Sequence, residues 1–245
     1  MKVLLLGGTA EARQLAGLLA DDAGVAVTAS LAGHTSVPAP YPCAVRTGGF
    51  GGIDGLVAYL RAAAVDAVVD ATHPCSRTMP RHAAEAAARA GVPRLRLARP
   101  PWARQLGDVW HDAEDVDHAA RLVAELGARR VLLTVGRFEL AAFAGAGATA
   151  SFVVRTVEPV DHLPLPHVEV VAARGPFTVA EEVTLLREGA IEVVVTRNAG
   201  GDDAKLAAAR ALALALVVVR RPSPQPGPMV ETATAARDWL LNVRR

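Results

Sequence analysis

The chain of 245 residues contains few cysteines and few aromatic residues, and its charges nearly cancel. The two cysteines, Cys43 and Cys75, match the spacing of neither a metal knuckle nor a redox CxxC pair, which favours a reduced, cytoplasmic protein. Lysine and arginine number 26 against 25 aspartates and glutamates, so no net field favours nucleic acid or a membrane surface as a partner. The most apolar run, 211–219, is too short to cross a bilayer, and the first residues lack the apolar core of a signal peptide. An anionic ligand must therefore be bound by locally placed arginines. We expect the protein to be a monomer or a small homo-oligomer.

The sequence is instead rich in short β-branched runs that alternate with longer helical patterns. Continuous apolar runs such as "AVVDAT" and "IEVVVT" are typical of parallel strands that are buried on both faces. Strands that alternate with helices imply right-handed crossovers and a doubly wound α/β fold. We expect strands at 3–7, 25–30, 43–47, 67–72, 94–98, 130–135, 152–157, 168–173, 191–196 and 215–220, and helices at 10–21, 53–64, 77–90, 114–127, 178–188, 203–213 and 231–243.

A domain boundary is expected near 98–108, where Pro100 and Pro101 exclude a helix and the periodicity lapses. Beyond it, "RVLLTVGRFEL" at 130–140 resembles "KVLLLGGTAEA" at 2–12, with Val-Leu-Leu, a Gly and a Glu at matching offsets. We therefore expect two similar α/β lobes, 1–105 and 106–245. The proline-rich stretch 222–228 is expected to be a rigid loop, because a helical pattern follows it.

The first predicted strand ends in a glycine corner, Gly7-Gly8-Thr9. Ligands of parallel sheets bind beyond the carboxyl ends of the strands, and glycine lets the backbone approach a phosphate closely. Thr9 is suited to cap the next helix, so that the N–H groups of Ala10, Glu11 and the following alanine point at a ligand. A full G-x-G-x-x-G is absent, and a plain tight turn into a helix is the competing interpretation.

The second and third predicted strands favour NADP over NAD as the dinucleotide. NAD-binding folds usually end the second strand with an acid that binds the ribose 2′-OH, but 25–35 contains no acid. Ser30 and Arg46 instead suit a 2′-phosphate. The loop "TGGFGG", which contains Gly48, Gly49 and Phe50, predicts a further close backbone approach, with a mobile surface loop as the alternative.

The segment "VVDATHP" places Asp70, Thr72 and His73 at or beyond the end of a buried strand. A histidine there is a candidate to donate a proton or to orient a coenzyme amide. Alternatively, Asp70 bonds loop amides and His73 caps the next helix. Cys75 follows without a His–acid arrangement, so a thiol nucleophile is not expected.

Cationic residues recur at later strand ends, and together they would suit a substrate with many carboxylates. Each one alone is more often a solvated residue or part of a local salt bridge. A second anion site is predicted in "TRNAGGDDAKL", although Asp202 and Asp203 could satisfy that helix end themselves. The candidate substrate contacts are Arg77, Arg137, Arg174, Arg197, Asn198, Gly200, Gly201 and Lys205, with Arg81 and Arg155 similarly placed.

The motifs "LLLGGTAEARQLA", "RTGGFGG", "DAVVDATHP", "RLARPPW", "TVGR", "ARGPF" and "VTRNAGGDDAKLAAARAL" followed by "VVVRRP" together resemble the precorrin-6A reductase family. They occur in the family's order from residue 4 to about 222. Departures are Cys75, where an aromatic is expected, and Arg197 and Ala199, where Lys and Ser are expected.

The resemblance implies two Rossmann-like lobes with a cleft between them, and an NADPH-dependent reduction of one ring C=C bond of precorrin-6A, giving precorrin-6B, in cobalamin biosynthesis. The family's coenzyme loop maps onto Gly7, Gly8, Thr9 and Ala10, and the substrate would be a tetrapyrrole polycarboxylate. His73 is the candidate catalytic acid. An NADP-dependent oxidoreductase for a smaller anion and a nucleotide-sensing regulator remain as alternatives.

Overall fold

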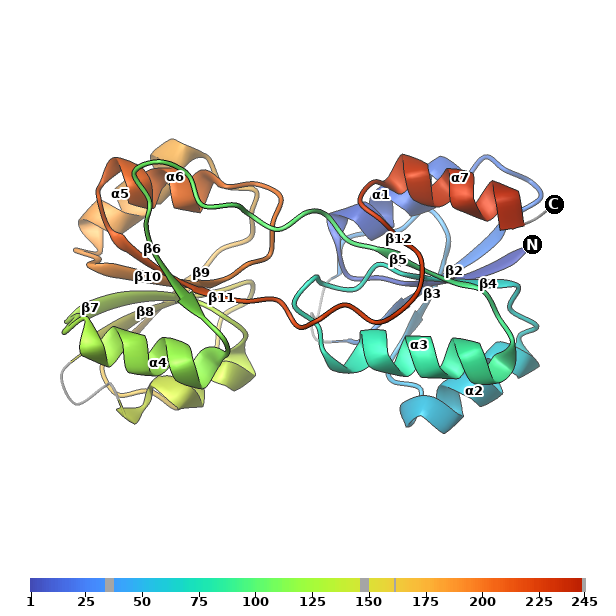
Figure 1. The fold of residues 1–245 in the computed structure, drawn as a ribbon, viewed down its shortest axis with the longest axis horizontal. Coiled ribbons are helices and arrows are strands. Elements are labelled where there is room, and N and C mark those ends of the chain that lie inside the picture. The colour runs from blue at the N-terminus through green and yellow to red at the C-terminus, as the bar shows by residue number, and fades with distance from the viewer. Residues whose placement is uncertain (34–37, 146–149, 161, 244–245) are drawn as a thin grey trace. The chain divides into compact units, whose positions relative to one another are not determined.

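The structure is a computed structural model that describes residues 1–33, 38–145, 150–160 and 162–243. It consists of two compact units, Met1–Pro100 with Pro222–Arg245 and Pro101–Arg221 (Figure 1). Each unit is a parallel sheet flanked by helices, which confirms the predicted fold class.

The first unit contains a six-stranded parallel sheet in the order β12-β5-β4-β1-β2-β3. Side chains of β1 alternate between its faces: Val3 and Leu5 join one core cluster, and Leu4 and Leu6 join the other. Helices α1 and α7 cover the first face and α2 and α3 the second (Figure 1). The bounds are β1 Lys2–Leu6, α1 Ala10–Leu19, β2 Ala26–Leu31, β3 Ala44–Thr47, α2 Gly52–Ala62, β4 Ala67–Asp70, α3 Thr78–Ala90, β5 Arg94–Leu97, β12 Met229–Val230 and α7 Ala233–Val243.

The second unit contains a six-stranded parallel sheet in the order β6-β11-β10-β7-β8-β9. Helix α4 and the 3₁₀-helix η1 pack on one face of this sheet, and α5 and α6 pack on the other. The bounds are β6 Val109–Ala113, α4 Val116–Glu125, β7 Arg130–Thr134, η1 Arg137–Phe143, β8 Ser151–Thr156, β9 Val168–Ala172, α5 Val179–Glu188, β10 Val193–Arg197, α6 Ala204–Ala211 and β11 Ala215–Val219.

Both sheets have the same doubly wound order, and in each the strand at one edge comes from a distant part of the chain. In the first unit β12 pairs with β5 and α7 packs against α1, so 222–245 belongs to this unit. The expected second lobe of 106–245 was therefore wrong at its C-terminal end. The predicted boundary near 98–108 contains the observed division after Pro100.

All the predicted strands and helices are present, with ends within two residues of the expected ones. The prediction missed β6, β12 and η1. β6 is only half apolar, "VWHDA", and β12 has two residues, so neither gives the continuous apolar run by which the other strands were found.

Candidate functional site

The turn between β1 and α1 presents backbone N–H groups at the carboxyl end of the first sheet. Thr9 caps α1, because its Oγ1 accepts a hydrogen bond from the Ala12 N–H (3.2 Å) and donates one to the Ala71 carbonyl (2.8 Å). Gly8 has a φ of +109°, a conformation that favours glycine. A helix N-terminus carries free N–H groups and partial positive charge. The turn therefore has the features that an anion site requires, and the ligand itself stays a prediction.

The group that approaches the Gly7 backbone closely in this structure is the side chain of Tyr41, from the same unit. A Cβ placed on Gly7 would lie 2.8 Å from the Tyr41 hydroxyl oxygen. That oxygen accepts a hydrogen bond from the Gly8 N–H at 3.0 Å. No sequence pattern pointed to Tyr41, which lies 33 residues from Gly8 in the connection between β2 and β3.

Arg46 and the predicted residues around it come together at the ends of β2 and β3. Ser30 and Arg46 are register partners on these strands. The Arg46 Nη1 donates to Ser30 Oγ (2.7 Å) and to the Gly48 carbonyl (3.1 Å), and Nη2 donates to the Gly49 carbonyl (3.0 Å). Its guanidinium carbon lies 3.9 Å from the centre of the Phe50 ring. The partly exposed Arg46 guanidinium is thus held in one orientation by four other predicted residues.

Glu11, in the first turn of α1, is paired with Arg99. Both oxygens of the Glu11 carboxylate accept hydrogen bonds from Arg99 Nη1, each at 3.0 Å. Burial raises the pKa of Glu11, but its backbone amide and Arg99 lower it more, and the pKa lies below its ordinary value. The carboxylate in the first turn of α1, which would repel a phosphate, is therefore neutralised by a cation.

Asp70 does not meet the expectation of a coenzyme contact, because its side chain is 0% exposed. Its Oδ1 accepts hydrogen bonds from Arg96 Nη1 (2.6 Å), from the Thr72 N–H (3.1 Å) and from Thr72 Oγ1 (2.7 Å). The alternative interpretation, in which Asp70 bonds loop amides, is the one that holds. Thr72 is only partly buried and remains next to the candidate site.

His73 is exposed, and its Nδ1 accepts a hydrogen bond from the Cys75 N–H (3.2 Å). Its candidate role as a catalytic acid stays a prediction. Cys75 is buried.

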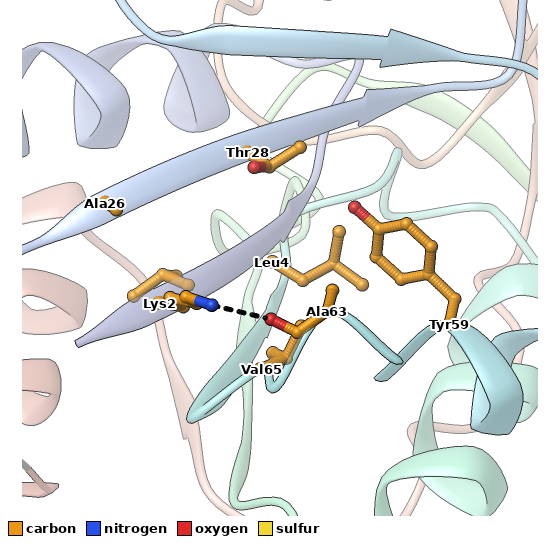
Figure 2. Close-up of a pocket in the computed structure, with 8 residues that line it drawn as sticks. Lys2, Leu4, Ala26, Thr28, Tyr59, Ala63 and Val65 are labelled. Atoms are coloured by element: carbon orange, nitrogen blue, oxygen red, sulfur yellow. Dashed lines mark hydrogen bonds between the residues drawn. The ribbon is translucent and has the colours of Figure 1, made fainter. Parts of the chain in front are cut away.

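A separate cavity of about 200 Å³ lies near the opposite ends of β1 and β2. Figure 2 shows Lys2 Nζ donating to the Ala63 carbonyl (3.2 Å), with the Tyr59 ring turned toward Thr28. Tyr59 also lies under the Arg46 guanidinium, 5.3 Å from ring centre to carbon. This cavity contains none of the predicted coenzyme contacts.

In the second unit Lys205 extends from α6 to the two central strands. Its Nζ donates to Thr134 Oγ1 at the end of β7 (2.9 Å) and to Thr196 Oγ1 on β10 (3.2 Å). Burial lowers the pKa of Lys205 to about 8, although the Glu182 carboxylate raises it. Strand order reverses between these two strands, and that is the position where doubly wound sheets bind ligands.

The predicted arginines of the second unit differ in what they contact. Arg137 is exposed and lies 4.6 Å from the centre of the Phe138 ring, and Arg174 is exposed. Arg197 forms an ion pair with Glu139 at 3.3 Å. Arg155 makes two hydrogen bonds to the Glu182 carboxylate (2.7 and 2.6 Å), and both side chains are buried. Arg155 therefore has a structural contact, as the local salt-bridge alternative proposed. Arg77 lies in the first unit, exposed at the start of α3.

The loop "NAGG" after β10 anchors other segments of its own unit. Asn198 Oδ1 accepts from the Trp102 N–H (2.8 Å) and Nδ2 donates to the Trp102 carbonyl (3.0 Å). Trp102 Nε1 donates to the Gly201 carbonyl (3.0 Å), and Arg221 donates to the Asn198 carbonyl (2.6 Å). The amide of Asn198 bonds to the backbone of Trp102, which is a structural contact, and its expected role as a substrate contact stays a prediction.

The helix end that follows this loop is satisfied in part by its own sequence. Asp202 Oδ1 accepts a hydrogen bond from the Ala204 N–H (2.9 Å). This agrees with the alternative in which the aspartates satisfy the helix end themselves. Gly200 and Gly201 have φ of +67° and +78°, so the turn itself requires glycine.

In the described part of the chain, no cluster of His, Cys, Asp and Glu could hold a metal ion, and no helix is long and apolar enough to cross a membrane. The sheet order and the glycine turn define the class of protein as a Rossmann-like α/β protein with a dinucleotide-type turn in its first unit.

Comparison with known proteins is more specific. The family model described as Precorrin-6x reductase CbiJ/CobK matches residues 2–241, and the chain belongs to this family of oxidoreductases. It is 49% identical to a Precorrin-6A reductase of Rhodococcus erythropolis over 86% of this chain and 85% of that protein. It is 27% identical to a Cobalt-precorrin-6A reductase of Priestia megaterium over 86% of each chain. The solved structure of a CobK precorrin-6A reductase superimposes with a TM-score of 0.93 at 40% identity, over 99% of this chain and 97% of that one.

Proposed function

We propose that the chain reduces a ring C=C bond of cobalt-free precorrin-6A with NADPH, in cobalamin biosynthesis. Family membership supports the reductase activity and the substrate class. The observation that supports NADPH in particular is the Arg46 guanidinium, held against Ser30 and Phe50 where the second strand ends without an acid. The choice of the cobalt-free substrate rests on 49% identity to a precorrin-6A reductase against 27% to a cobalt-precorrin-6A reductase.

The coenzyme fits the first unit by the chemistry of the residues present. Arg46 and Ser30 would bind the 2′-phosphate, and the turn from Gly8 to Glu11 would bind the pyrophosphate through the N–H groups of Thr9 and Ala10. When bound, NADPH supplies the hydride. Arg99 neutralises Glu11 and so prevents repulsion in the first turn of α1. His73, which is exposed after β4, is the candidate to orient a polar group of the coenzyme or the substrate.

The substrate carboxylates would be bound by cations of the second unit. Lys205, Arg137 and Arg174 are the candidates, with Arg197 positioned by Glu139. The Lys205 ammonium is a suitable anchor because two threonine hydroxyls fix it and leave one N–H for a carboxylate oxygen. Arg77 and the peptide groups of Gly200 and Gly201 are further predicted contacts. These residues bind and orient, while the redox chemistry belongs to the coenzyme.

The test is to titrate the purified protein with NADPH and NADH, and then to add precorrin-6A or cobalt-precorrin-6A while the reduced nicotinamide is followed by absorbance. We expect tighter binding of NADPH, and oxidation only when a tetrapyrrole is present, faster with the cobalt-free one. Oxidation that does not depend on the tetrapyrrole would overturn the proposal. A faster reaction with the cobalt complex would overturn only the choice of substrate.

A further inference from the structure

Tyr41 is a polar residue of the first unit that the proposed coenzyme site does not yet use. It lies between β2 and β3, close to the carboxyl edge of the sheet. Its side chain packs against the hydrophobic core between the sheet and helices α1 and α7, and this packing fixes the position of the ring. Only the hydroxyl reaches the glycine turn, where it accepts the Gly8 N–H at 3.0 Å.

The position of this hydroxyl explains why residue 7 is glycine. A Cβ on Gly7 would lie 2.8 Å from the Tyr41 oxygen and 3.3 Å from the ring carbon that carries it. A Cβ on Gly8, by contrast, would meet no atom within 4 Å. The absent side chain at Gly7 thus makes room for the phenol group of this protein, and the open space lies on the side of Gly8.

A phenol oxygen accepts hydrogen bonds and also has one proton to donate. The accepting function is used by the Gly8 N–H, while the described residues offer the hydroxyl proton no acceptor. The N–H groups of the first turn of α1 are directed to the same edge. The turn therefore presents a hydroxyl donor beside its amide donors, an arrangement that fits the oxygens of a phosphate and not a cation.

We propose that the Tyr41 hydroxyl is a ligand of the coenzyme, donating its hydrogen bond to the phosphate on the adenosine 5′-oxygen while it accepts the Gly8 N–H. This assignment rests on the proposed function and concerns a residue outside the family motifs found in the sequence. It separates the coenzyme site into two parts: Arg46 and Ser30 bind the 2′-phosphate, and Tyr41 with the turn binds the 5′-phosphate.

The experiment uses two fragments that differ only in the 5′-phosphate, adenosine 2′,5′-bisphosphate and adenosine 2′-monophosphate, with NADPH as the whole ligand. Affinities are measured by calorimetry for the wild type, Tyr41→Phe and Arg46→Ala. We expect Tyr41→Phe to weaken NADPH and the bisphosphate about 5- to 20-fold, as for loss of a hydrogen bond to a charged group, and to leave the monophosphate unchanged. Arg46→Ala should weaken all three.

Thr28→Val is the matched control, because it removes a hydroxyl from β2 near the other end of the sheet and should change no affinity. Tyr41→Phe keeps the packed ring, and its thermal unfolding should match that of the wild type. Unchanged or tighter binding of the bisphosphate by Tyr41→Phe would overturn the assignment, the tighter result meaning that a phosphate displaces the hydroxyl. If the wild type binds none of the three ligands, the proposed coenzyme has failed instead.

Discussion

Replacement of Asp70 by Asn tests whether this residue holds the fold together or contacts the coenzyme. The carboxylate is fully buried and lies 2.6 Å from Arg96, whose side chain is 10% exposed. Removing one partner of a buried ion pair leaves the other charge without compensation, at a cost of about 3–5 kcal/mol. Asn retains an oxygen that accepts from Thr72 and Arg96, so we expect the lower end, about 3 kcal/mol. For a unit of this size that is a fall of roughly 10 °C in the unfolding midpoint.

The assay is thermal unfolding followed by circular dichroism, together with the dissociation constant of NADPH measured well below the transition. Asp70→Asn should lower the midpoint and leave the dissociation constant within about twofold, since no surface of the side chain faces a ligand. Arg46→Ala is the opposite case, because its guanidinium is partly exposed and its loss should weaken NADPH with little effect on the midpoint. If Asp70→Asn instead weakens NADPH and unfolds at the wild-type temperature, the structural interpretation of Asp70 is wrong.

Substitutions of Arg46, Lys205 and Asn198 test the coenzyme site, the buried ammonium and the contact with Trp102. Arg46→Ala should raise the dissociation constant for NADPH by about 10- to 100-fold and leave that for NADH nearly unchanged, as measured by nicotinamide fluorescence. The pKa of Lys205 is about 8 in the folded protein against an ordinary 10.5. Between these pH values the unfolded chain binds more protons than the folded one, so the contribution of Lys205 to the free energy of unfolding rises with pH. Urea unfolding across that window should therefore show wild type gaining on the order of 3 kcal/mol relative to Lys205→Met, and a difference that falls with pH would contradict the burial of the ammonium. Asn198→Ala should cost about 2 kcal/mol through its two lost bonds to Trp102 and shift tryptophan fluorescence, whereas a substrate contact would change only the Michaelis constant.

The sequence allowed prediction of those parts of the site that depend on neighbouring strands. Ser30 and Arg46 end strands that follow each other in the chain, and consecutive strands of a parallel sheet usually lie side by side. The register indeed pairs them directly. The same reasoning applied to the next strands would have paired Asp70 with Arg96, which are also register partners, and would have revealed the ion pair. Asp70 was expected to contact the coenzyme because every polar residue at a strand end was interpreted as a ligand contact.

Other features depend on contacts between distant segments and leave no local pattern. Tyr41 approaches Gly8 through the packing of a loop, and Asn198 meets Trp102 from 96 residues away. The strand β12 has only two residues, and its partner β5 lies on the far side of the whole second unit in sequence. Periodicity reports which face of an element is buried, but it does not report which other element covers that face.

The two units, which were predicted to be similar, differ at the turns that follow β1 and β7. Gly8 and Glu11 correspond to Gly136 and Glu139 in the matching stretches. In the second unit Glu139 turns back to accept the Gly136 N–H (2.9 Å), so a carboxylate occupies the place of an anion, and a 3₁₀-helix follows. In the first unit Glu11 pairs with Arg99, and the Tyr41 hydroxyl accepts a hydrogen bond from the Gly8 N–H.

The two matching stretches thus differ in the group that accepts the N–H of the corresponding glycine, a hydroxyl at Gly8 and a carboxylate at Gly136. Each glutamate has an arginine partner, Arg99 for Glu11 and Arg197 for Glu139, so the difference lies in the group that a phosphate would meet at the glycine: the Tyr41 hydroxyl at Gly8 and the Glu139 carboxylate at Gly136. Removal of Arg99 should release Glu11 from its ion pair and weaken the binding of a phosphate at the first turn of α1. These contacts favour the proposed coenzyme site in the first unit, and the proposal leaves the cations of the second unit for a substrate that carries carboxylates.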